Sequence, residues 1–182
     1  MIAKGGVHLA DHFEEKSPKA ILHKYDPDAI VLQDYSTVAL DFGHAGRSAR
    51  ALMSFCKYVT IKKVLFATWP REDGHKLYQT PGMPKTSAAM NTLVEQHYTI
   101  SSRCQSMSER AATRVAPVGH AWILGTGLPL HRQDGYHASL TGAWLSALVL
   151  ARTMGLAPDM PVAPKGVKVP GRLTQIARIV AP

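Results

Sequence analysis

The segment Asp134-Gly135-Tyr136-His137 contains residue types from which a hydrolytic site can be built. An aspartate three residues before a histidine can place its carboxylate against the imidazole when both lie in a tight turn, and Asp-Gly favours such a turn. The carboxylate would then fix the ring tautomer and leave the second ring nitrogen to act as a general base. The same spacing also suits an aspartate that only caps a turn, so the surrounding sequence has to decide between the two.

Short apolar runs and helical patterns alternate along the chain and indicate which elements position this turn. Apolar runs after turn signals predict buried strands over residues 29–33, 64–68 and 114–118. Helical spacing of apolar residues predicts helices over residues 48–58, 86–102, 139–154 and 171–180. This alternation predicts a three-layer α/β fold with a mostly parallel sheet. In such sheets the residues that do chemistry follow the carboxyl ends of the strands. The corresponding loops are residues 33–36, 68–74 and 119–122.

The residues around the Asp-x-x-His turn carry a family resemblance. Asp134-Gly135-Tyr136-His137-Ala138-Ser139, followed by an apolar helix, resembles the last conserved block of SGNH/GDSL hydrolases, which are esterases on a flavodoxin-like sheet. Ala138 stands where that block usually has a proline. Further stretches that resemble conserved parts of the family are residues 28–36, 64–71 and 115–122. The resemblance covers about residues 5 to 155 and implies an abbreviated flavodoxin-like (SGNH hydrolase) fold.

The resemblance also implies roles for individual residues. In a carboxylic ester hydrolase of this type, His137 would be the general base and Asp134 would orient it. No cofactor is implied, and the substrate would be a small-molecule or polymeric ester. Trp69 follows a predicted strand and would bind substrate in a cleft, although packing in the core is an alternative for this side chain.

The donors of the oxyanion hole follow from two other family blocks. The segment Gly5-Gly6-Val7-His8-Leu9 resembles the block whose glycine donates a backbone N–H, so Gly6 (or Gly5) would be that donor. The next block usually supplies an asparagine side chain, but this chain has no Gly-x-Asn-Asp there. Gln33 or Ser36 is the nearest polar substitute.

The nucleophile is the part of the family pattern that we expect to be missing. In the family, the nucleophilic serine lies in a Gly-x-Ser turn that precedes the glycine block, and here that block begins at residue 5. Ser36 is the candidate replacement because it follows a predicted strand, although a serine also suits a turn at that place. Ser139 more readily caps the last long helix. Catalysis by His137 with water, or loss of activity, are the remaining alternatives.

The missing block would also remove the first strand of the sheet. The strand over residues 29–33 would then lose a neighbour, and an unpaired apolar edge pairs with another chain or aggregates. We therefore expect a homodimer. The domain organisation predicted is an SGNH-hydrolase-like domain over residues 1–157, followed by a Pro-rich linker and short C-terminal helix over residues 158–182.

Two rival functions remain open from the sequence. One is a catalytically impaired relic or binding module. The other is a metal-dependent hydrolase, because His8 and His12 could share a helix face, with Asp11 adjacent; this evidence for a metal is weak. His44, in Asp41-Phe42-Gly43-His44, is placed in a loop without a clear partner.

The composition narrows the classes of partner. The net charge is +8, from 21 basic and 13 acidic residues, but the basic residues are scattered and match no nucleic-acid motif, so we expect no nucleic-acid partner. No uninterrupted apolar run of about 18 residues is present, so we expect no membrane span. The first six residues contain no apolar signal-peptide core, which fits a cytoplasmic protein and equally a processed or truncated form.

Overall fold

The computed structural model describes residues 6–14, 22–58, 61–102, 113–156 and 163–181. The chain forms two compact units. The first unit consists of Met1–Phe66 and Gln96–Val115, and the second consists of Ala67–Glu95 and Ala116–Pro182.

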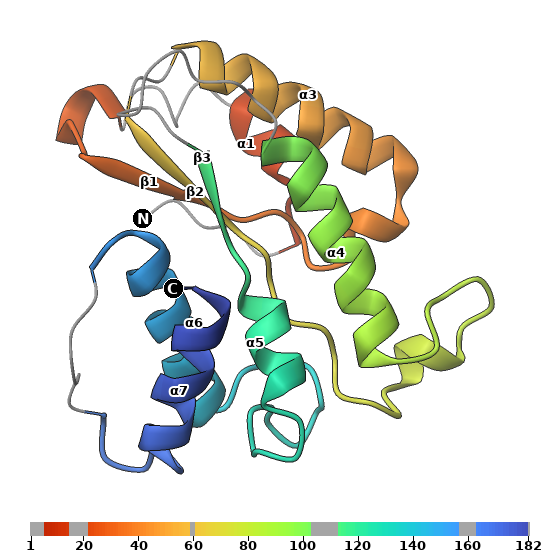
Figure 1. The fold of residues 1–182 in the computed structure, drawn as a ribbon. Coiled ribbons are helices and arrows are strands. Elements are labelled where there is room, and N and C mark those ends of the chain that lie inside the picture. The colour runs from red at the N-terminus through yellow and green to blue at the C-terminus, as the bar shows by residue number, and fades with distance from the viewer. Residues whose placement is uncertain (1–5, 15–21, 59–60, 103–112, 157–162, 182) are drawn as a thin grey trace. The chain divides into compact units, whose positions relative to one another are not determined.

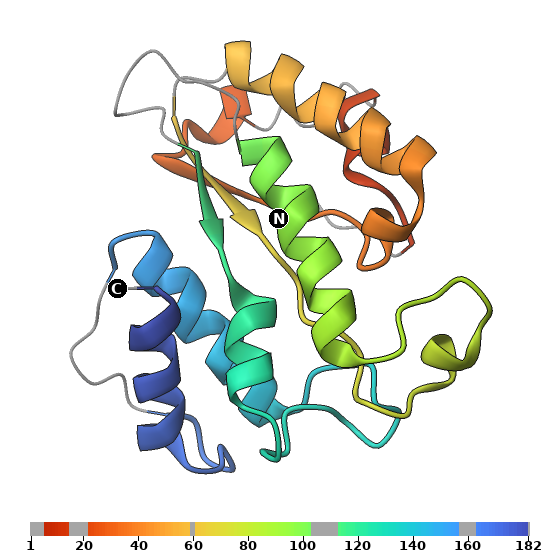
Figure 2. The ribbon, with the colours of Figure 1, turned by 45° about the vertical axis from the view of Figure 1, so that its right-hand side comes forward.

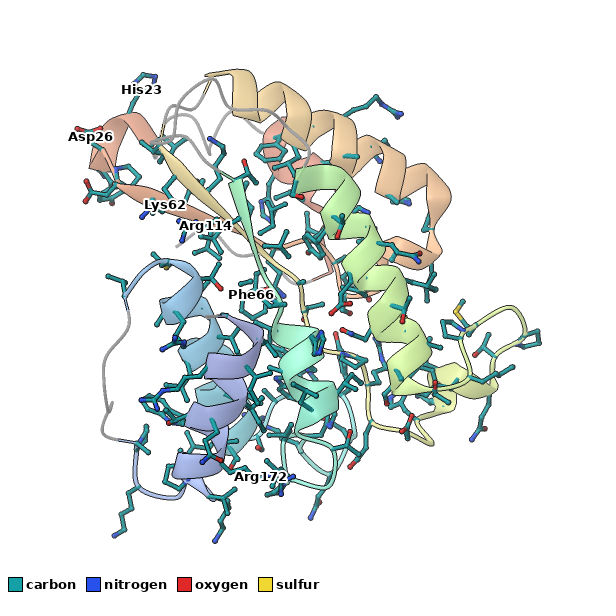
Figure 3. All side chains as sticks on the ribbon, in the orientation of Figure 1. His23, Asp26, Lys62, Phe66, Arg114 and Arg172 are labelled. Carbon is teal, nitrogen blue, oxygen red and sulfur yellow. The ribbon has the colours of Figure 1, made fainter. Side chains whose placement is uncertain are left out.

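The first unit is built on a small sheet in the order β1-β2-β3 (Figure 1). Its strands are β1 (Ala29–Leu32), β2 (Lys62–Phe66) and β3 (Thr113–Ala116). Strand β1 runs parallel to β2, with Ala29 opposite Lys62 and Leu32 opposite Leu65. Figure 3 marks Lys62 and Phe66 at the two ends of β2 and Arg114 on β3. The central strand begins with two lysines and continues with the apolar residues Val64, Leu65 and Phe66, which are buried on both faces as is usual in parallel sheets.

Helices of the first unit pack on one another beside this sheet. They are α1 (Leu9–Glu14), the 3₁₀ helix η1 (Val38–Leu40) and α3 (Phe42–Tyr58). Helix α1 packs against α3 (Figure 1), and Arg47 of α3 donates from Nη2 to Asp11 and to Glu14, each at 3.0 Å. Helix α4 (Ser87–Ser102) starts in the second unit and contributes its last turns to the first.

The second unit is mainly helical. Its elements after α4 are α5 (Val118–Leu124), α6 (Leu140–Thr153) and α7 (Pro170–Val180), and the 3₁₀ helix η2 (Lys76–Gln79) precedes α4. Figures 1 and 2 both show α6 and α7 side by side. Their shared core contains fully buried apolar side chains, among them Leu145, Val149 and Leu173. The α6–α7 pair therefore places the C-terminal helix inside this unit.

The predicted α/β class is confirmed. The predicted strands and three of the four predicted helices are found within a few residues, whereas α3 begins at Phe42, six residues before the predicted start at Ser48. The second strand covers 62–66 instead of 64–68, with Lys63 buried and its Nζ donating to the Ile61 carbonyl at 3.0 Å. The third ends at Ala116 because Pro117 has no N–H for a ladder. One placement was wrong: residues 119–122 form the middle of helix α5 and not a loop.

Two further predictions concern the edges of the fold. Among the described residues β1 pairs on one side only, and Val31 on it is 40% exposed; the homodimer stays a prediction. The predicted linker includes residues 157–162, which lie outside the described residues. Beyond them, the Lys168 backbone N–H donates to Thr141 Oγ1 at 3.1 Å, so this part of the segment is tied to α6. No described helix is both long and apolar enough to cross a membrane.

Candidate active site

The Asp-x-x-His segment forms a tight turn at the end of a short two-stranded pairing in the second unit. The Arg132 N–H donates to the His137 carbonyl at 2.8 Å, and the Ser139 N–H donates to the Leu130 carbonyl at 2.8 Å. Gly135 has a φ of +62°, in the left-handed region that favours glycine. Ser139 then begins α6, since its Oγ accepts from the Gly142 N–H at 3.1 Å. The predicted cap at Ser139 is confirmed.

Within this turn, Asp134 and His137 are joined as the sequence predicts. Asp134 Oδ2 lies 2.7 Å from His137 Nδ1, while Asp134 Oδ1 accepts from the backbone N–H groups of Tyr136 and His137, both at 2.8 Å. A carboxylate at Nδ1 makes that nitrogen the proton-bearing one and leaves Nε2 with its lone pair. Nε2 has no hydrogen bond to any described residue, and the His137 side chain is 62% exposed. The arrangement is that of an oriented general base facing solvent.

The electrostatics of the pair hold the carboxylate in its charged form. The hydrogen bond with the His137 side chain is the main cause that lowers the pKa of Asp134 well below its usual range, and the two backbone N–H donors add to the effect. Asp134 therefore stays an acceptor at every pH at which histidine titrates.

Three contacts from a distant segment hold the turn in place. The Trp69 indole N–H donates to the Tyr136 carbonyl at 3.0 Å, and the Glu72 N–H donates to the Gly135 carbonyl at 2.8 Å. His131 Nε2 bonds to the Pro70 carbonyl at 3.0 Å. Trp69 in turn stacks on Trp122, with ring centroids 4.7 Å apart and an interplanar angle of 8°. Trp69 is thus a positioning residue for the turn; its role in binding substrate stays a prediction.

A second Asp-x-x-His turn lies in the first unit, where the sequence placed His44 in a loop without a partner. That placement was wrong. Asp41 Oδ2 lies 2.7 Å from His44 Nδ1, and Asp41 Oδ1 accepts from the His44 N–H at 3.0 Å. Asp41 is extended, and its carbonyl accepts from the Ala45 N–H, so it caps the start of α3. The His44 ring stacks on the His8 ring at 4.2 Å.

Asp34 lies at the centre of the polar residues next to this second turn. It is buried, and its Oδ1 accepts from the Leu9 and Tyr35 backbone N–H groups at 2.9 and 2.8 Å. Its own N–H donates to the buried Tyr98 hydroxyl at 2.9 Å. Two histidines flank the carboxylate, with His8 Nδ1 at 3.5 Å and His97 Nε2 at 3.8 Å. These bonds tie α1, the end of β1 and α4 together.

Burial and hydrogen bonding act in opposite directions on Asp34. Burial raises its pKa, but the interactions with His97 and Ser48 and the two backbone N–H donors outweigh burial, so the pKa lies below its usual value. The buried carboxylate is therefore charged at neutral pH and stabilises the first unit.

The remaining predicted site residues all belong to the first unit. Gly6 is exposed with a φ of +71°, and Gly5 lies outside the described residues. Gln33 follows β1 and is exposed. Ser36 lies three residues further along, with its Oγ buried and without a hydrogen bond to a described residue. The assignment of these residues to the oxyanion hole and the nucleophile stays a prediction.

The structure places the two N-terminal histidines of the metal hypothesis just before α1 and within it. His8 precedes α1 and donates its backbone N–H to Asp11 Oδ2 at 3.0 Å, and His12 lies within the helix with its Nδ1 buried. Across the described ranges, no group of three or more His, Cys, Asp and Glu side chains is placed to hold a metal ion.

Comparison with solved structures finds a similar fold in the crystal structure of a DUF4886 family protein from Bacteroides uniformis ATCC 8492. The match covers 98% of this chain and 79% of that chain, with a TM-score of 0.75 and 16% sequence identity. Likeness at this identity concerns the fold alone. No family model matches the sequence, and no curated protein matches it.

Two residues near the Asp134–His137 dyad were not singled out by the sequence. They are Arg71, whose guanidinium carbon lies 4.4 Å from the centroid of the Tyr136 ring, and His131, which holds the turn to Pro70. The sequence offered only weak indications of them, since Arg71 follows a predicted strand and His131 lies beside the Asp-x-x-His motif. The Asp41–His44 pair had a stronger signal, since its spacing repeats that of Asp134 and His137.

Proposed function

We propose that this protein hydrolyses carboxylic esters, with His137 as the general base and Asp134 as the residue that orients it. The observation that carries the proposal is the 2.7 Å contact between Asp134 and His137 Nδ1, together with an exposed His137 side chain whose Nε2 has no hydrogen bond to a described residue. The resemblance of residues 134–139 to the last block of SGNH/GDSL hydrolases supports the same reaction. The shared α/β fold is compatible with this family.

In the proposed reaction His137 first accepts a proton from the attacking hydroxyl group and then donates it to the leaving alcohol. Nε2 takes the proton of a hydroxyl group whose oxygen forms a bond to the ester carbonyl carbon. The tetrahedral intermediate then collapses, the bond to the alkoxy oxygen breaks, and the imidazolium returns the proton to the leaving alcohol. Asp134 stabilises the imidazolium in between and keeps its own negative charge. With a serine nucleophile, water repeats the sequence on the acyl-serine and releases the acid.

Ser36 is the nucleophile that we propose, and Gly6 and Gln33 are the proposed oxyanion donors. Two observations support Ser36: it follows the carboxyl end of a parallel strand, and its Oγ has no hydrogen-bond partner among the described residues. An oxyanion donor is typically worth roughly 3 kcal/mol of barrier. If Gln33 is such a donor, replacing it should slow ester hydrolysis without abolishing it.

The test is hydrolysis of p-nitrophenyl acetate by the purified protein. His137→Ala is expected to lower kcat/KM by about 10³-fold or more. His44→Ala is the matched control, because His44 lies in a turn of the same spacing, and it is expected to keep the activity. Equal rates for the wild type and His137→Ala would refute the proposal.

Two further arms separate the proposal from its rivals. Loss of activity in Ser36→Ala identifies the serine route, whereas full activity there assigns the attack to water. Activity that disappears with a chelator and returns with zinc would favour a metal-dependent reaction instead.

A further inference from the structure

Hydrogen bonds to the backbone carbonyl of Arg71 fix this residue close to the Asp134–His137 dyad. Its carbonyl accepts two hydrogen bonds from side-chain hydroxyls, one from Tyr78 at 2.8 Å and one from Ser87 at 2.6 Å. Both of these residues are buried, and the Ser87 N–H is held by Asp73 Oδ1 at 2.6 Å. The start of the Arg71 side chain is therefore fixed in position by the core of the second unit.

The Arg71 guanidinium packs on the aromatic ring next to the proposed base. Its Cζ lies 4.4 Å from the Tyr136 ring centroid, and the Tyr136 and His137 ring centroids are 4.4 Å apart. Two consecutive contacts thus link the guanidinium to the imidazole through one ring. A guanidinium stacked on a ring keeps its N–H donors at its edge, where they match the two oxygens of a carboxylate.

These donors have no hydrogen-bond partner among the described residues. Arg71 is partly exposed, and its side chain forms no hydrogen bond or ion pair with any described residue. Two nearby acids are hydrogen-bonded to other groups: Asp134 to the His137 ring, and Asp73 to the Ser87 N–H at the start of α4. Glu72 is exposed and forms no ion pair with a described cation.

Three cations, Arg71, Lys76 and Arg132, lie in the same loop and turn as the carboxylates of Glu72, Asp73 and Asp134. Burial lowers the pKa of His75 in the same loop, and the positive charges of Arg71 and Lys76 lower it further. Arg132 also lies at the turn, where its Nε donates to the Ala138 carbonyl at 3.1 Å. A net charge of +8 adds a long-range attraction for anions.

We infer that Arg71 binds an anionic group of the substrate, so that the esters hydrolysed at His137 carry a carboxylate on the alcohol or acyl part. This inference rests on the proposed function and adds the substrate class to it. Arg71 is then a specificity-determining residue, and the Tyr136 ring holds its guanidinium in a binding geometry in the free protein.

The experiment uses a matched pair of substrates, 4-acetoxybenzoate and its methyl ester. Both release an acetyl group, and only the first carries a negative charge. Arg71→Gln is expected to lower the ratio of kcat/KM for the charged ester to that for the neutral ester by about tenfold or more, because it removes a charge-assisted bidentate contact. Lys76→Gln, which removes an exposed cation from the same loop, is the control and should leave the ratio within about twofold. An unchanged ratio in Arg71→Gln, or an equal fall in Lys76→Gln, would overturn the inference.

A binding measurement separates this inference from the proposed function. 4-Acetamidobenzoate carries the same carboxylate on an amide, which resists hydrolysis, and its affinity is measured by calorimetry. Weaker binding by Arg71→Gln than by wild type, with Lys76→Gln unchanged, supports the anion site even if neither ester is hydrolysed. Equal binding by wild type and Arg71→Gln refutes the site even if His137→Ala abolishes ester hydrolysis.

Discussion

The chain contains two Asp-x-x-His turns with the same carboxylate-to-imidazole distance, 2.7 Å, and different surroundings. Asp41 and His44 begin helix α3, where the aspartate satisfies a backbone N–H that every helix start leaves open. Asp134 and His137 lie in a turn that ends before α6, and Ser139 caps that helix instead. Asp41 therefore caps a helix, whereas Asp134 caps the N–H groups of its own turn, outside any helix.

Hydrogen bonds from the backbone N–H and from the side chain of the histidine lower the pKa of both aspartates, in a different order. For Asp41 the backbone N–H of His44 is the main cause, as expected of a cap. For Asp134 the His137 side chain is the main cause. His44 also has a face covered by His8 and is 38% exposed, against 62% for His137. An Asp-x-x-His spacing is thus a local geometry that occurs in two surroundings, at a helix start and in a turn with a more exposed imidazole.

The largest expected difference between the two turns is in catalysis. Asp134→Asn should lower kcat for p-nitrophenyl acetate by about 10³- to 10⁴-fold, because an amide no longer fixes the productive tautomer. Asp41→Asn should leave kcat within about twofold, since asparagine is an equally good helix cap. Steady-state kinetics on both variants check this. A comparable loss in Asp41→Asn would show that the two turns are not functionally distinct.

The next effect concerns stability around the first turn. Asp34→Asn should lower the free energy of unfolding at pH 7 by about 1–3 kcal/mol, because buried backbone N–H groups lose a charged acceptor. The folded pKa of Asp34 is depressed, so its contribution is complete above the unfolded value of about 3.9 and is lost as the pH falls through the lower folded value. The free energy of unfolding, measured by urea denaturation from pH 7 to pH 3, should therefore depend less on pH in the variant than in the wild type.

The control for this measurement is Asp28→Asn, which changes an exposed aspartate without a partner among the described residues. It should follow the wild-type profile. A wild-type profile in Asp34→Asn would mean that the buried carboxylate does not stabilise the region around the first turn.

The smallest expected effect is on stability, when the glycine inside each turn is replaced by alanine. The change in the free energy of unfolding should have opposite signs in the two turns. Gly135→Ala should cost about 1–2 kcal/mol, because alanine is strained at a φ of +62° and its Cβ would lie 3.4 Å from Glu72 Cβ. Gly43→Ala should raise stability by up to about 1 kcal/mol, because Gly43 is helical and alanine is the better helix former. Thermal unfolding measures both. Changes of the same sign would contradict the backbone conformations described for the two turns.

The fold was largely predictable because its signals are local. Apolar runs and helical spacing identified β1, β2, β3 and the long helices, and Ser139 was recognisable as a cap. Helix α5 was missed because it is short and follows Pro117, where an apolar run resembles the end of a strand. Its Gly119 is required by packing, since a Cβ there would strike Asn91 and the Thr68 carbonyl. That requirement cannot be read from neighbours in the sequence.

Partners three residues apart meet through local turn geometry, so the sequence by itself determined both aspartate–histidine pairs, although only the pair of Asp134 and His137 was predicted from it. Only the tertiary structure decided how they differ. Trp69 and Pro70 lie more than sixty residues from the turn that they hold, and Arg71 reaches Tyr136 across a similar separation. Contacts of this range depend on how the chain packs, and they leave His137 exposed on a fixed turn while His44 lies against His8. Spacing therefore specified the pairs, and packing specified which imidazole is the more exposed.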